Sequence, residues 1–310
     1  MASHDQDARI VGSGQEMRQI KRYLMRVAGV GSTVLITGET GTGKELVAET
    51  IHTASTRSTQ PMVCVNCAAI PDSLVESELF GYCKGAFTGA LLPQKGKFAL
   101  ATHGTLFLDE IGEMSPHAQA KILRSIESNT IFPLGARRAV QLDVRIIAAT
   151  NRDPEALVAE GLFRRDLYYR LNVAHIHLPP LRERKEDIPQ LVDMAITRLN
   201  RRLTRDIHAF SNEALAALVQ YNWPGNVREL NNLIEACFLQ CETKRIEFVD
   251  LPPAFTKRLH FGDGDDERSR LMAALQSTRW NKSEAARRLQ WSRMRIYRSM
   301  KRYNISPTPV

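Results

Sequence analysis

The sequence has little of what marks membrane and secreted proteins. None of its apolar runs approaches the roughly 18 residues needed to span a bilayer, and its first ten residues, MASHDQDARI, lack the apolar core of a secretory signal. Only five cysteines occur in 310 residues, and this odd number disfavours a disulfide framework. With 43% apolar and 25% charged residues, the composition is that of a globular protein. We expect cytoplasmic residence without membrane association.

Two pairs of cysteines are closely spaced. Cys64 and Cys67 form a C-x-x-C motif, and Cys237 and Cys241 lie one helical turn apart. A redox pair or a zinc site stays open, but no second C-x-x-C and no H-x3-H motif follows at zinc spacing. We interpret these cysteines as small buried apolar residues.

Positive charge is concentrated in one segment near the C-terminus. Residues 268–303 hold eleven basic side chains and one acid, a net charge of +10, whereas the whole chain carries +8. A solvated helix face normally mixes both signs, so this excess predicts a surface that binds phosphate groups. The basic side chains are Arg268, Arg270, Arg279, Lys282, Arg287, Arg288, Arg293, Arg295, Arg298, Lys301 and Arg302.

The order of patterns predicts an α/β fold followed by helical parts. Short apolar runs alternate with helical patterns up to residue 180, which indicates a parallel sheet covered on both faces. From residue 185 to about 241 the patterns are only helical, and a Gly- and Asp-rich tether precedes the basic segment. We expect an N-terminal tail over 1–9, the sheet domain over 10–182, a helical subdomain over 183–255, a linker over 256–266 and a basic helical domain over 267–306.

The clearest chemical motif follows the first predicted strand, residues 34–36. It has the form G-x-x-x-x-G-K and precedes a predicted helix, which is the context of a phosphate-binding loop. Its glycines let backbone N–H groups wrap phosphates, and the helix N-terminus adds its positive dipole end. A lysine there reaches the β- and γ-phosphates of ATP. The motif comprises Gly38, Glu39, Thr40, Gly41, Thr42, Gly43 and Lys44, followed by Glu45.

Glu45 departs from the general pattern, since a Ser or Thr hydroxyl usually binds Mg²⁺ at that position. The metal then needs another acid, and the predicted strand over 105–108 ends in Asp109 and Glu110. Asp109 suits Mg²⁺ coordination, and Glu110 suits the general base that activates water. Asn151 ends the next predicted strand and is a candidate for sensing the γ-phosphate or positioning water; without the surrounding pattern, an Asn in a turn would be the ordinary explanation.

The basic segment contains two helical patterns joined by a short turn. Residues 282–289 and 293–303 form these patterns, with Asn281 or Ser283 as a cap for the first and Ser292 for the second. Ile296, Met300 and Tyr303 are expected to pack inward. The pair predicts a helix-turn-helix whose second helix enters the major groove, although a basic hairpin without base readout stays open. The expected DNA-contacting residues are Lys282, Arg287, Arg293, Arg295, Arg298 and Arg302.

Six segments of the chain resemble the AAA+ activators of sigma-54 RNA polymerase, the bacterial enhancer-binding proteins of the nitrogen-regulator type, from about residue 10 to the end. The resemblance implies an AAA+ core with a helical lid, a Fis-type helix-turn-helix, ATP and Mg²⁺ as ligands, and a ring, commonly a hexamer, built from dimers. The segments are GETGTGKE (38–45), GAFTGA (85–90), GTLFLDE (104–110), FRRDLYYRL (163–171), LPPLRER (178–184) and WPGNVREL (223–230).

The same resemblance implies roles for single residues. Arg164 and Arg170 match the arginine fingers that reach a neighbouring subunit's γ-phosphate, although composition alone does not separate them from surface arginines. Arg228 matches the lid arginine that senses nucleotide, and Asn66 matches the asparagine that pairs with the catalytic glutamate, here Glu110. The residues alone leave a structural turn with a buried Phe87 open. The resemblance implies instead that the six-residue loop contacts the sigma factor and promoter DNA; it comprises Gly85, Ala86, Phe87, Thr88, Gly89 and Ala90.

We therefore predict an ATPase that binds enhancer DNA at the nucleoid and remodels the closed complex of sigma-54 RNA polymerase holoenzyme. Because the AAA+ pattern starts near residue 10, we expect no sensory domain and control by expression or by a separate regulatory protein; a fragment would look identical. The rivals are an ATP-free DNA-binding repressor, which requires a degenerate ATP site, and a replication initiator, which would lack the GAFTGA loop.

Overall fold

A computed structural model of the chain describes residues 10–259, 271–272, 274–275, 277–278, 280–289, 291, 293–303 and 305; the side chains of residues 258, 293, 301 and 302 are outside this description. The chain divides into two compact units, residues 1–203 with 223–232 and residues 204–222 with 233–310. Within the described part of the chain, no helix is both long and apolar enough to cross a membrane.

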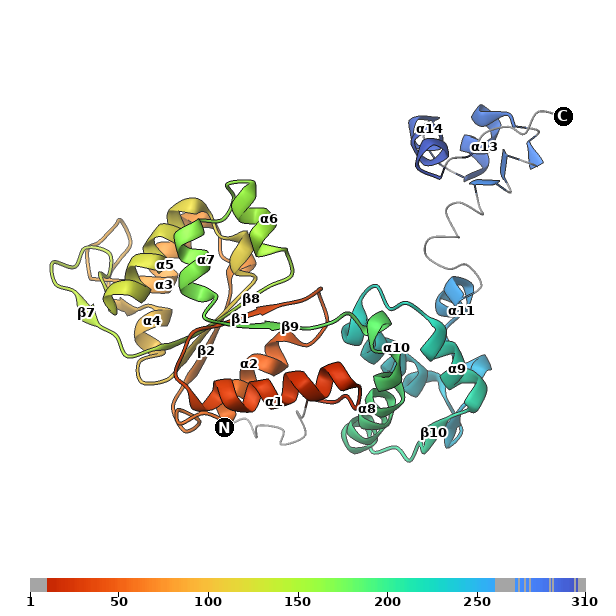
Figure 1. Cartoon of the computed structure of the whole chain (residues 1–310), viewed down its shortest axis with the longest axis horizontal. Coiled ribbons are helices and arrows are strands. Elements are labelled where there is room, and N and C mark those ends of the chain that lie inside the picture. The colour runs from red at the N-terminus through yellow and green to blue at the C-terminus, as the bar shows by residue number, and fades with distance from the viewer. Residues whose placement is uncertain are drawn as a thin grey trace. The chain divides into compact units, whose positions relative to one another are not determined.

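The first unit is built on a five-stranded parallel sheet of order β2-β5-β8-β1-β9 (Figure 1). Strands β1 and β8 are buried at every position, because helices cover both faces of the sheet. The sequences of these two strands are accordingly almost wholly apolar. This confirms the predicted α/β fold class. The strands are β1 (Val34–Thr37), β2 (Met62–Asn66), β5 (Thr105–Asp109), β8 (Arg145–Thr150) and β9 (Ala174–His177).

Alternate side chains of each strand feed two separate cores. Leu106 and Leu108 pack on the face covered by α3, α4, α5, α6 and α7, whereas Phe107 packs on the face covered by α1 and α2 (Figure 1). This follows from the two-residue period of a strand. The helices of the unit are α1 (Gln15–Gly29), α2 (Lys44–Thr53), α3 (Asp72–Phe80), α4 (Lys97–Leu100), α5 (Pro116–Ser128), α6 (Pro154–Ala159), α7 (Arg165–Leu171) and α8 (Ile188–Leu203).

A buried arginine holds the C-terminal end of α1. Arg145, the first residue of β8, is 3% exposed and donates to the carbonyls of Ala28 at 3.0 Å and Val27 at 2.7 Å. The last carbonyls of a helix lack the usual i+4 N–H partner. The guanidinium bonds both of these, and the Val27 carbonyl also accepts from the Val30 N–H at 3.2 Å. Burial lowers the pKa of Arg145 from its ordinary value.

Three two-stranded pairings were not predicted. Two are antiparallel, β3 (Gly81–Tyr82) with β4 (Gln94–Lys95) and β6 (Thr130–Ile131) with β7 (Val140–Gln141). The third is parallel, β10 (Ala209–Phe210) with β11 (Arg245–Ile246). The expectation of helices alone over 185–241 was therefore wrong at β10, because two residues are too short to display a strand period.

The second unit contains α9 (Asn212–Gln220), α11 (Pro253–Leu259), α13 (Lys282–Leu289) and α14 (Arg293–Arg302), and α10 (Asn226–Gln240) runs into it from the first unit. Ala285, Ala286, Ile296 and Met300 form the buried core between α13 and α14, with Tyr303 packed against it. This confirms the inward-facing positions predicted for the second helix. The small alanines let the two helices approach closely.

Candidate functional site

The phosphate-binding segment forms the turn between β1 and α2. Gly38, Gly41 and Gly43 have φ of +152°, +81° and +105°, a region that favours glycine. Lys44, the first residue of α2, is 6% exposed, and its Nζ donates to the carbonyls of Gly38 at 3.0 Å and Glu39 at 3.4 Å. The lysine therefore points back over the loop that would surround a phosphate. Glu45 is exposed on the next position of the helix.

The two predicted carboxylates stand beside this lysine. Glu110 Oε1 lies 3.4 Å from Lys44 Nζ, and Asp109 Oδ1 accepts from the backbone N–H of Glu110 at 3.1 Å. Burial raises the pKa of Asp109, and the neighbouring charge of Glu110 raises it further. Glu110 has φ of +52°, so its side chain leaves the line of β5.

Asn151 links the acid pair to the phosphate-binding loop. Its backbone N–H donates to Glu110 Oε2 at 2.9 Å, and its Nδ2 donates to Thr40 Oγ1 at 2.9 Å. Strand order explains the meeting, because β8 lies between β5 and β1 and the carboxyl ends of parallel strands share one edge.

Asn66 lies at the same edge but has a different partner from the one the resemblance implied. It is in register with Asp109, and its Oδ1 accepts from the backbone N–H of Ala68 at 3.0 Å. In this arrangement the Asn66 side chain caps the short turn over Cys67–Ala69 and is not hydrogen-bonded to Glu110.

Residues that sequence reasoning gave no role hold the start of α10 against the phosphate-binding loop. Arg182 donates to both oxygens of Glu39, at 2.9 Å and 2.7 Å, and this bond lowers the pKa of Glu39. Asn226 Nδ2 donates to Glu39 Oε2 and to the Thr40 carbonyl, both at 3.1 Å. Both residues lie in the motifs LPPLRER and WPGNVREL, which were the available signal.

Two further arginines meet the same loop. Arg184 is 4% exposed and donates to the Thr42 carbonyl at 3.0 Å. The backbone N–H of Arg228 donates to the Gly41 carbonyl at 3.3 Å, while its side chain is exposed. The predicted lid residue therefore lies next to the loop.

The two predicted finger arginines are engaged locally on α7 and the residue before it. Arg164 donates to both oxygens of Asp166, at 3.1 Å and 2.7 Å, and Arg170 donates to the Ile126 carbonyl at 3.4 Å. Their predicted targets belong to a neighbouring subunit.

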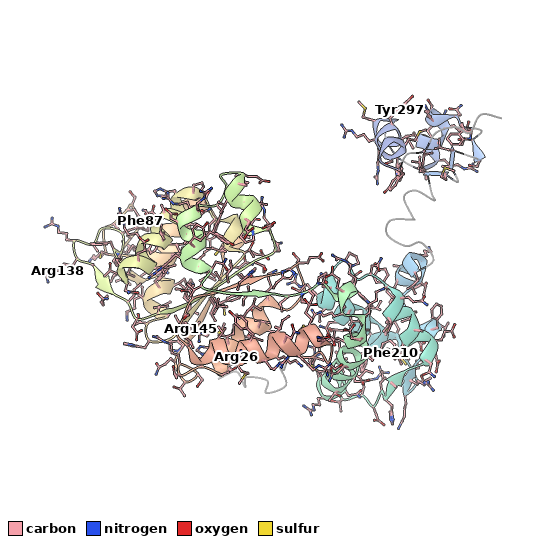
Figure 2. The ribbon with its side chains drawn as sticks, viewed as in Figure 1. Arg26, Phe87, Arg138, Arg145, Phe210 and Tyr297 are labelled. Atoms are coloured by element: carbon pink, nitrogen blue, oxygen red, sulfur yellow. The ribbon has the colours of Figure 1, made fainter. Side chains whose placement is uncertain are left out.

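The GAFTGA loop is a closed turn with an exposed tip. The Gly85 N–H donates to the Ala90 carbonyl at 2.8 Å, and the Ala90 N–H donates to the Phe87 carbonyl at 3.0 Å. Phe87 is 48% exposed, and its ring meets that of Tyr82 edge-on at 4.9 Å between centroids. Phe87 therefore lies at the surface (Figure 2), not in a buried structural turn, and Thr88 is exposed beside it.

In the helix-turn-helix, Asn281 is the cap of α13, since its Oδ1 accepts from Ser283 and Glu284 at 3.1 Å and 3.2 Å. Arg287, Arg295 and Arg298 are exposed. The side chains of Arg293 and Arg302, and the whole of Ser292, lie outside the described residues.

Aromatic rings support two of the basic side chains. Arg295 stacks over Trp291 at 4.3 Å, and Lys282 lies over the ring of Tyr297 at 4.8 Å. Tyr297 is 53% exposed (Figure 2). Sequence reasoning missed Tyr297 because it assigned only basic side chains to DNA contact.

The cysteines gave a mixed result. Cys67, Cys237 and Cys241 are buried, as predicted, but Cys64 is exposed, because β2 is an edge strand of the sheet. Burial raises the pKa of Cys237 to about 12. Among the described residues, no group of three or more His, Cys, Asp and Glu side chains is arranged to hold a metal ion.

The fold and these motifs define a AAA+ nucleotide-binding protein with a helix-turn-helix. Residues 10–177 match the Sigma-54 interaction domain, residues 182–267 the AAA+ ATPase lid domain, and residues 265–303 the bacterial regulatory proteins of the Fis family. The chain belongs to the family of sigma-54-dependent transcriptional activators.

Similar proteins support this assignment. Transcriptional regulatory protein ZraR of Klebsiella oxytoca is 44% identical over 94% of this chain and 68% of its own length. The Nif-specific regulatory protein of Azotobacter vinelandii is 44% identical over 96% of this chain and 59% of its own length. Crystal structures of NtrX from Brucella abortus with ADP and with ATP have a TM-score of 0.72, 31% identity, and cover 97% and 96% of this chain and 70% of theirs.

Proposed function

We propose that this chain hydrolyses ATP and uses that energy to remodel the closed promoter complex of sigma-54 RNA polymerase while bound to enhancer DNA. The observation that carries the proposal is the meeting of Lys44, Glu110 and Asn151 at one edge of the sheet, with Glu110 within 3.4 Å of the lysine and 2.9 Å of the Asn151 N–H. A phosphate-binding loop, a base and a polar sensor are the parts that phosphoryl transfer needs.

Residues 38–45 would bind the phosphates of ATP. Backbone N–H groups and the start of α2 supply positive potential, and Lys44 exchanges its bonds to the Gly38 and Glu39 carbonyls for phosphate oxygens. Arg228 would report nucleotide from the lid side. The relative NtrX was crystallised with both ADP and ATP, which supports this assignment.

The acid pair fits a magnesium ion. Two adjacent carboxylates face a single lysine, and burial and mutual repulsion raise the pKa of Asp109, so a divalent cation complements the site. Asp109 would hold Mg²⁺ in place of the missing hydroxyl at position 45. When bound, Mg²⁺ supplies charge neutralisation to the phosphate oxygens.

Hydrolysis would then use this chain's own groups in sequence. Glu110 would take a proton from the attacking water as the water oxygen bonds to the γ-phosphorus. The bond between that phosphorus and the bridging oxygen breaks, which leaves ADP and inorganic phosphate. Asn151 senses the γ-phosphate through the link it makes to Glu110 and Thr40. Asn66 would pair with Glu110 in another state and hold the base inactive.

The complete ATP site would need residues from a neighbouring subunit, as in a ring. The ring would be a hexamer assembled from dimers. Arg164 and Arg170 would reach the neighbour's γ-phosphate, and Arg164 would exchange Asp166 for that target. Loop residues 85–90 would transmit the cycle to the sigma factor and promoter DNA. The enhancer DNA would be contacted by the basic side chains predicted from the sequence, Lys282, Arg287, Arg293, Arg295, Arg298 and Arg302.

Open-complex formation with sigma-54 holoenzyme tests the proposal. We expect activation to require hydrolysable ATP and Glu110→Gln to lower kcat about 10²- to 10⁴-fold while ATP still binds. Thr88→Ala should keep ATP turnover and lose activation, because it removes only the polar contact at the loop tip.

Thr53→Ala is the matched control, since Thr53 is also an exposed threonine but lies on α2. It should leave both turnover and activation unchanged. Unimpaired activation by Thr88→Ala would contradict the role of the loop, and unimpaired hydrolysis by Glu110→Gln would contradict the role of the base.

A further inference from the structure

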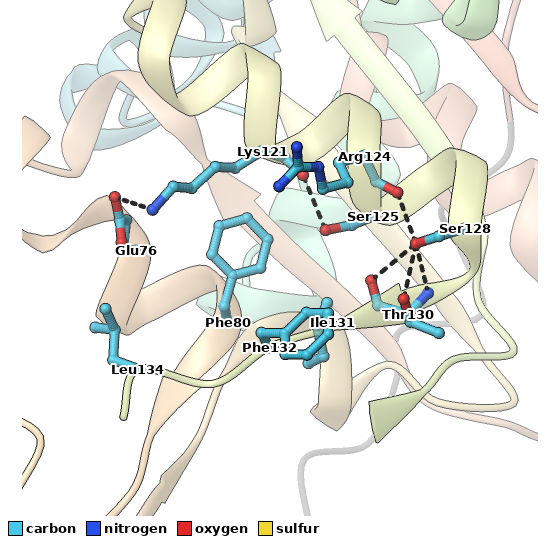
Figure 3. Close-up of a pocket in the computed structure, with 10 residues that line it drawn as sticks. All are labelled: Glu76, Phe80, Lys121, Arg124, Ser125, Ser128, Thr130, Ile131, Phe132 and Leu134. Atoms are coloured by element: carbon cyan, nitrogen blue, oxygen red, sulfur yellow. Dashed lines mark hydrogen bonds and ion pairs between the residues drawn. The ribbon is translucent and has the colours of Figure 1, made fainter. Parts of the chain in front are cut away.

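A cavity of about 350 Å³ lies at the root of the GAFTGA loop, between α3, the C-terminal half of α5 and the segment that follows β6 (Figure 3). It is separate from the phosphate-binding loop and from the sheet edge that carries the acid pair. Its volume is at the lower end of the range for small-molecule pockets in proteins.

Apolar side chains form one wall of the cavity. Phe80 and Ile131 are buried, Leu134 is half-buried, and Phe132 is 59% exposed at the mouth. An aromatic ring left at the surface next to a hollow favours an apolar ligand, because burying such area stabilises a complex.

The opposite wall, from α5, carries charge that is not fully neutralised. Lys121 forms an ion pair with Glu76, and His117 lies 2.8 Å from the same carboxylate. The bond to Lys121 is the main reason that the pKa of Glu76 is lowered. Glu76 is therefore already committed to partners.

Arg124 is the remaining charge at the cavity. In Figure 3 no dashed line joins its guanidinium to any other residue drawn, and among the described residues no hydrogen bond or ion pair of this side chain is found. The nearby hydroxyls are satisfied locally, since Ser125 donates to the Lys121 carbonyl at 2.9 Å and Ser128 to the Arg124 carbonyl at 2.8 Å. Arg124 is exposed, so water solvates its guanidinium, and it is the cation at this cavity that an anionic group of a ligand could meet.

We propose that the cavity binds a small organic carboxylate with an apolar, single-ring body. The carboxylate would bind the Arg124 guanidinium, which presents parallel N–H donors that match it. The ring would occupy the hollow against Phe80, Ile131 and Phe132.

The position of the cavity makes its occupancy relevant to the loop. The Leu134 N–H donates to the Gly81 carbonyl and the Cys83 N–H donates to the Leu134 carbonyl, both at 2.9 Å. Phe80 and Leu134, both on the apolar wall of the cavity, thus belong to the segments whose pairing anchors residues 85–90. A bound ligand would stabilise this pairing and so regulate the loop; regulation of the loop rests on the proposed function, whereas binding does not.

Ligand-observed fluorine NMR on the full chain tests binding without ATP, DNA or polymerase. The probes are 4-fluorobenzoate and its uncharged analogue 4-fluorobenzamide. We expect saturable binding of the benzoate and at least about threefold weaker binding of the amide, because an exposed ion pair contributes up to about 1 kcal/mol, or about fivefold in affinity.

Arg124→Gln should weaken benzoate binding about three- to fivefold, and Arg124→Lys should retain part of it. Arg22→Gln is the matched control, because Arg22 is an exposed arginine on α1; it should change nothing. Equal binding of both probes, equal weakening by the two glutamine variants, or no saturable binding of the benzoate would overturn the site.

Hydrogen exchange tests the link to the loop separately. Saturating 4-fluorobenzoate should slow exchange of the Cys83 and Leu134 amides at least about twofold in the wild type. At a benzoate concentration near the wild-type Kd, the slowing should be smaller in Arg124→Gln, in proportion to its lower occupancy. Unchanged exchange in a saturated wild type would overturn the regulatory part. An inactive ATPase would affect neither measurement, so failure of the proposed function is distinguishable.

Discussion

At the scale of single residues, the ionised form of Asp109 lowers the stability of the folded chain. Burial and the charge of Glu110 raise its pKa, so the folded chain binds this proton more readily than the unfolded chain does. Its contribution to stability is present at acid pH, below the ordinary pKa of aspartate, and is lost as pH rises through the raised value. At neutral pH the ionised group therefore destabilises the nucleotide-free protein.

Asp109→Asn should raise the Tm at pH 7.5 by about 2–4 °C, the shift that about 1 kcal/mol produces in a domain of this size, and abolish ATP hydrolysis. The gain should be smaller at pH 4, because the raised pKa lets the wild-type carboxyl take up more of its proton there than at pH 7.5. Thermal unfolding at the two pH values measures this. Asp143→Asn is the control of opposite sign, because Arg57 and His103 lower the pKa of Asp143, and it should not raise the Tm. A lower Tm for Asp109→Asn would contradict the argument.

Glu39 is the residue through which the loop meets Arg182 and Asn226. The side chains of Glu39 and Arg182 are both about 40% exposed, so Glu39→Gln should cost less than about 1 kcal/mol of unfolding free energy. It should raise the KM for ATP about fivefold with kcat little changed, because it loosens ground-state positioning of the loop. Steady-state kinetics check this.

Glu183→Gln is the matched control, because Glu183 also faces Arg182, at 3.7 Å, but lies outside the loop. It should leave the KM unchanged. If both variants raise the KM equally, the effect comes from the charge of Arg182 and not from the anchoring of the loop.

At the scale of elements, the loop and the start of α10 are in backbone contact at Gly41. A Cβ on this residue would lie 2.4 Å from the Gly225 carbonyl oxygen, and its φ is +81°. Gly41→Ala should cost more than about 2 kcal/mol and weaken ADP binding, because a left-handed alanine adds about 1–2 kcal/mol before any clash.

Gly161→Ala separates strain from contact. Gly161 has φ of +73° and nothing within 4 Å of the added Cβ, so it should show only the strain cost of about 1–2 kcal/mol and normal ADP affinity. Urea unfolding and nucleotide titration compare the two variants. If the two variants lose the same free energy of unfolding, the close contact with Gly225 does not contribute to the destabilisation.

At the scale of the whole molecule, the proposed ATP site divides its residues between two subunits. Lys44 would act on the nucleotide of its own chain, whereas Arg164, paired with Asp166 in this structure, would act on a neighbour's. Because the fingers of one subunit serve the site of the next, defects in the two residues should complement each other.

Mixing Lys44→Ala with Arg164→Ala protein should restore ATP turnover, since some sites then combine an intact loop with an intact finger. For random mixing in equal amounts we expect about a quarter of the wild-type rate, measured as phosphate release at concentrations that support assembly. Mixing Lys44→Ala with Glu110→Gln should restore nothing, because both lie in the same half-site. Failure of the first mixture with assembly intact would place the fingers in cis.

The parts that sequence reasoning could reach were those with local signals. The apolar strands, the loop over 38–44 and the inward positions Ile296 and Met300 follow from periodicity and motif spacing. The sequence did not predict β10 and β11, because two residues are too short to show a strand period. It also did not predict the exposure of Cys64, which depends on β2 lying at the sheet edge. The roles of Arg182 and Asn226 were also hidden, because their partner Glu39 is more than 140 residues away.

The sequence by itself determined the AAA+ class and the helix-turn-helix and predicted the residues of the proposed ATP site, because phosphate binding and helix packing need particular residue types at fixed spacings. Only the tertiary structure decided that Asn66 caps its own turn, that Arg164 rests on Asp166, and that Arg124 borders a cavity at the loop root. The first two contacts join residues only two positions apart, and the sequence alone does not decide between these partners and more distant ones. The third depends on which segments the fold brings together around Arg124, and no local pattern records that arrangement.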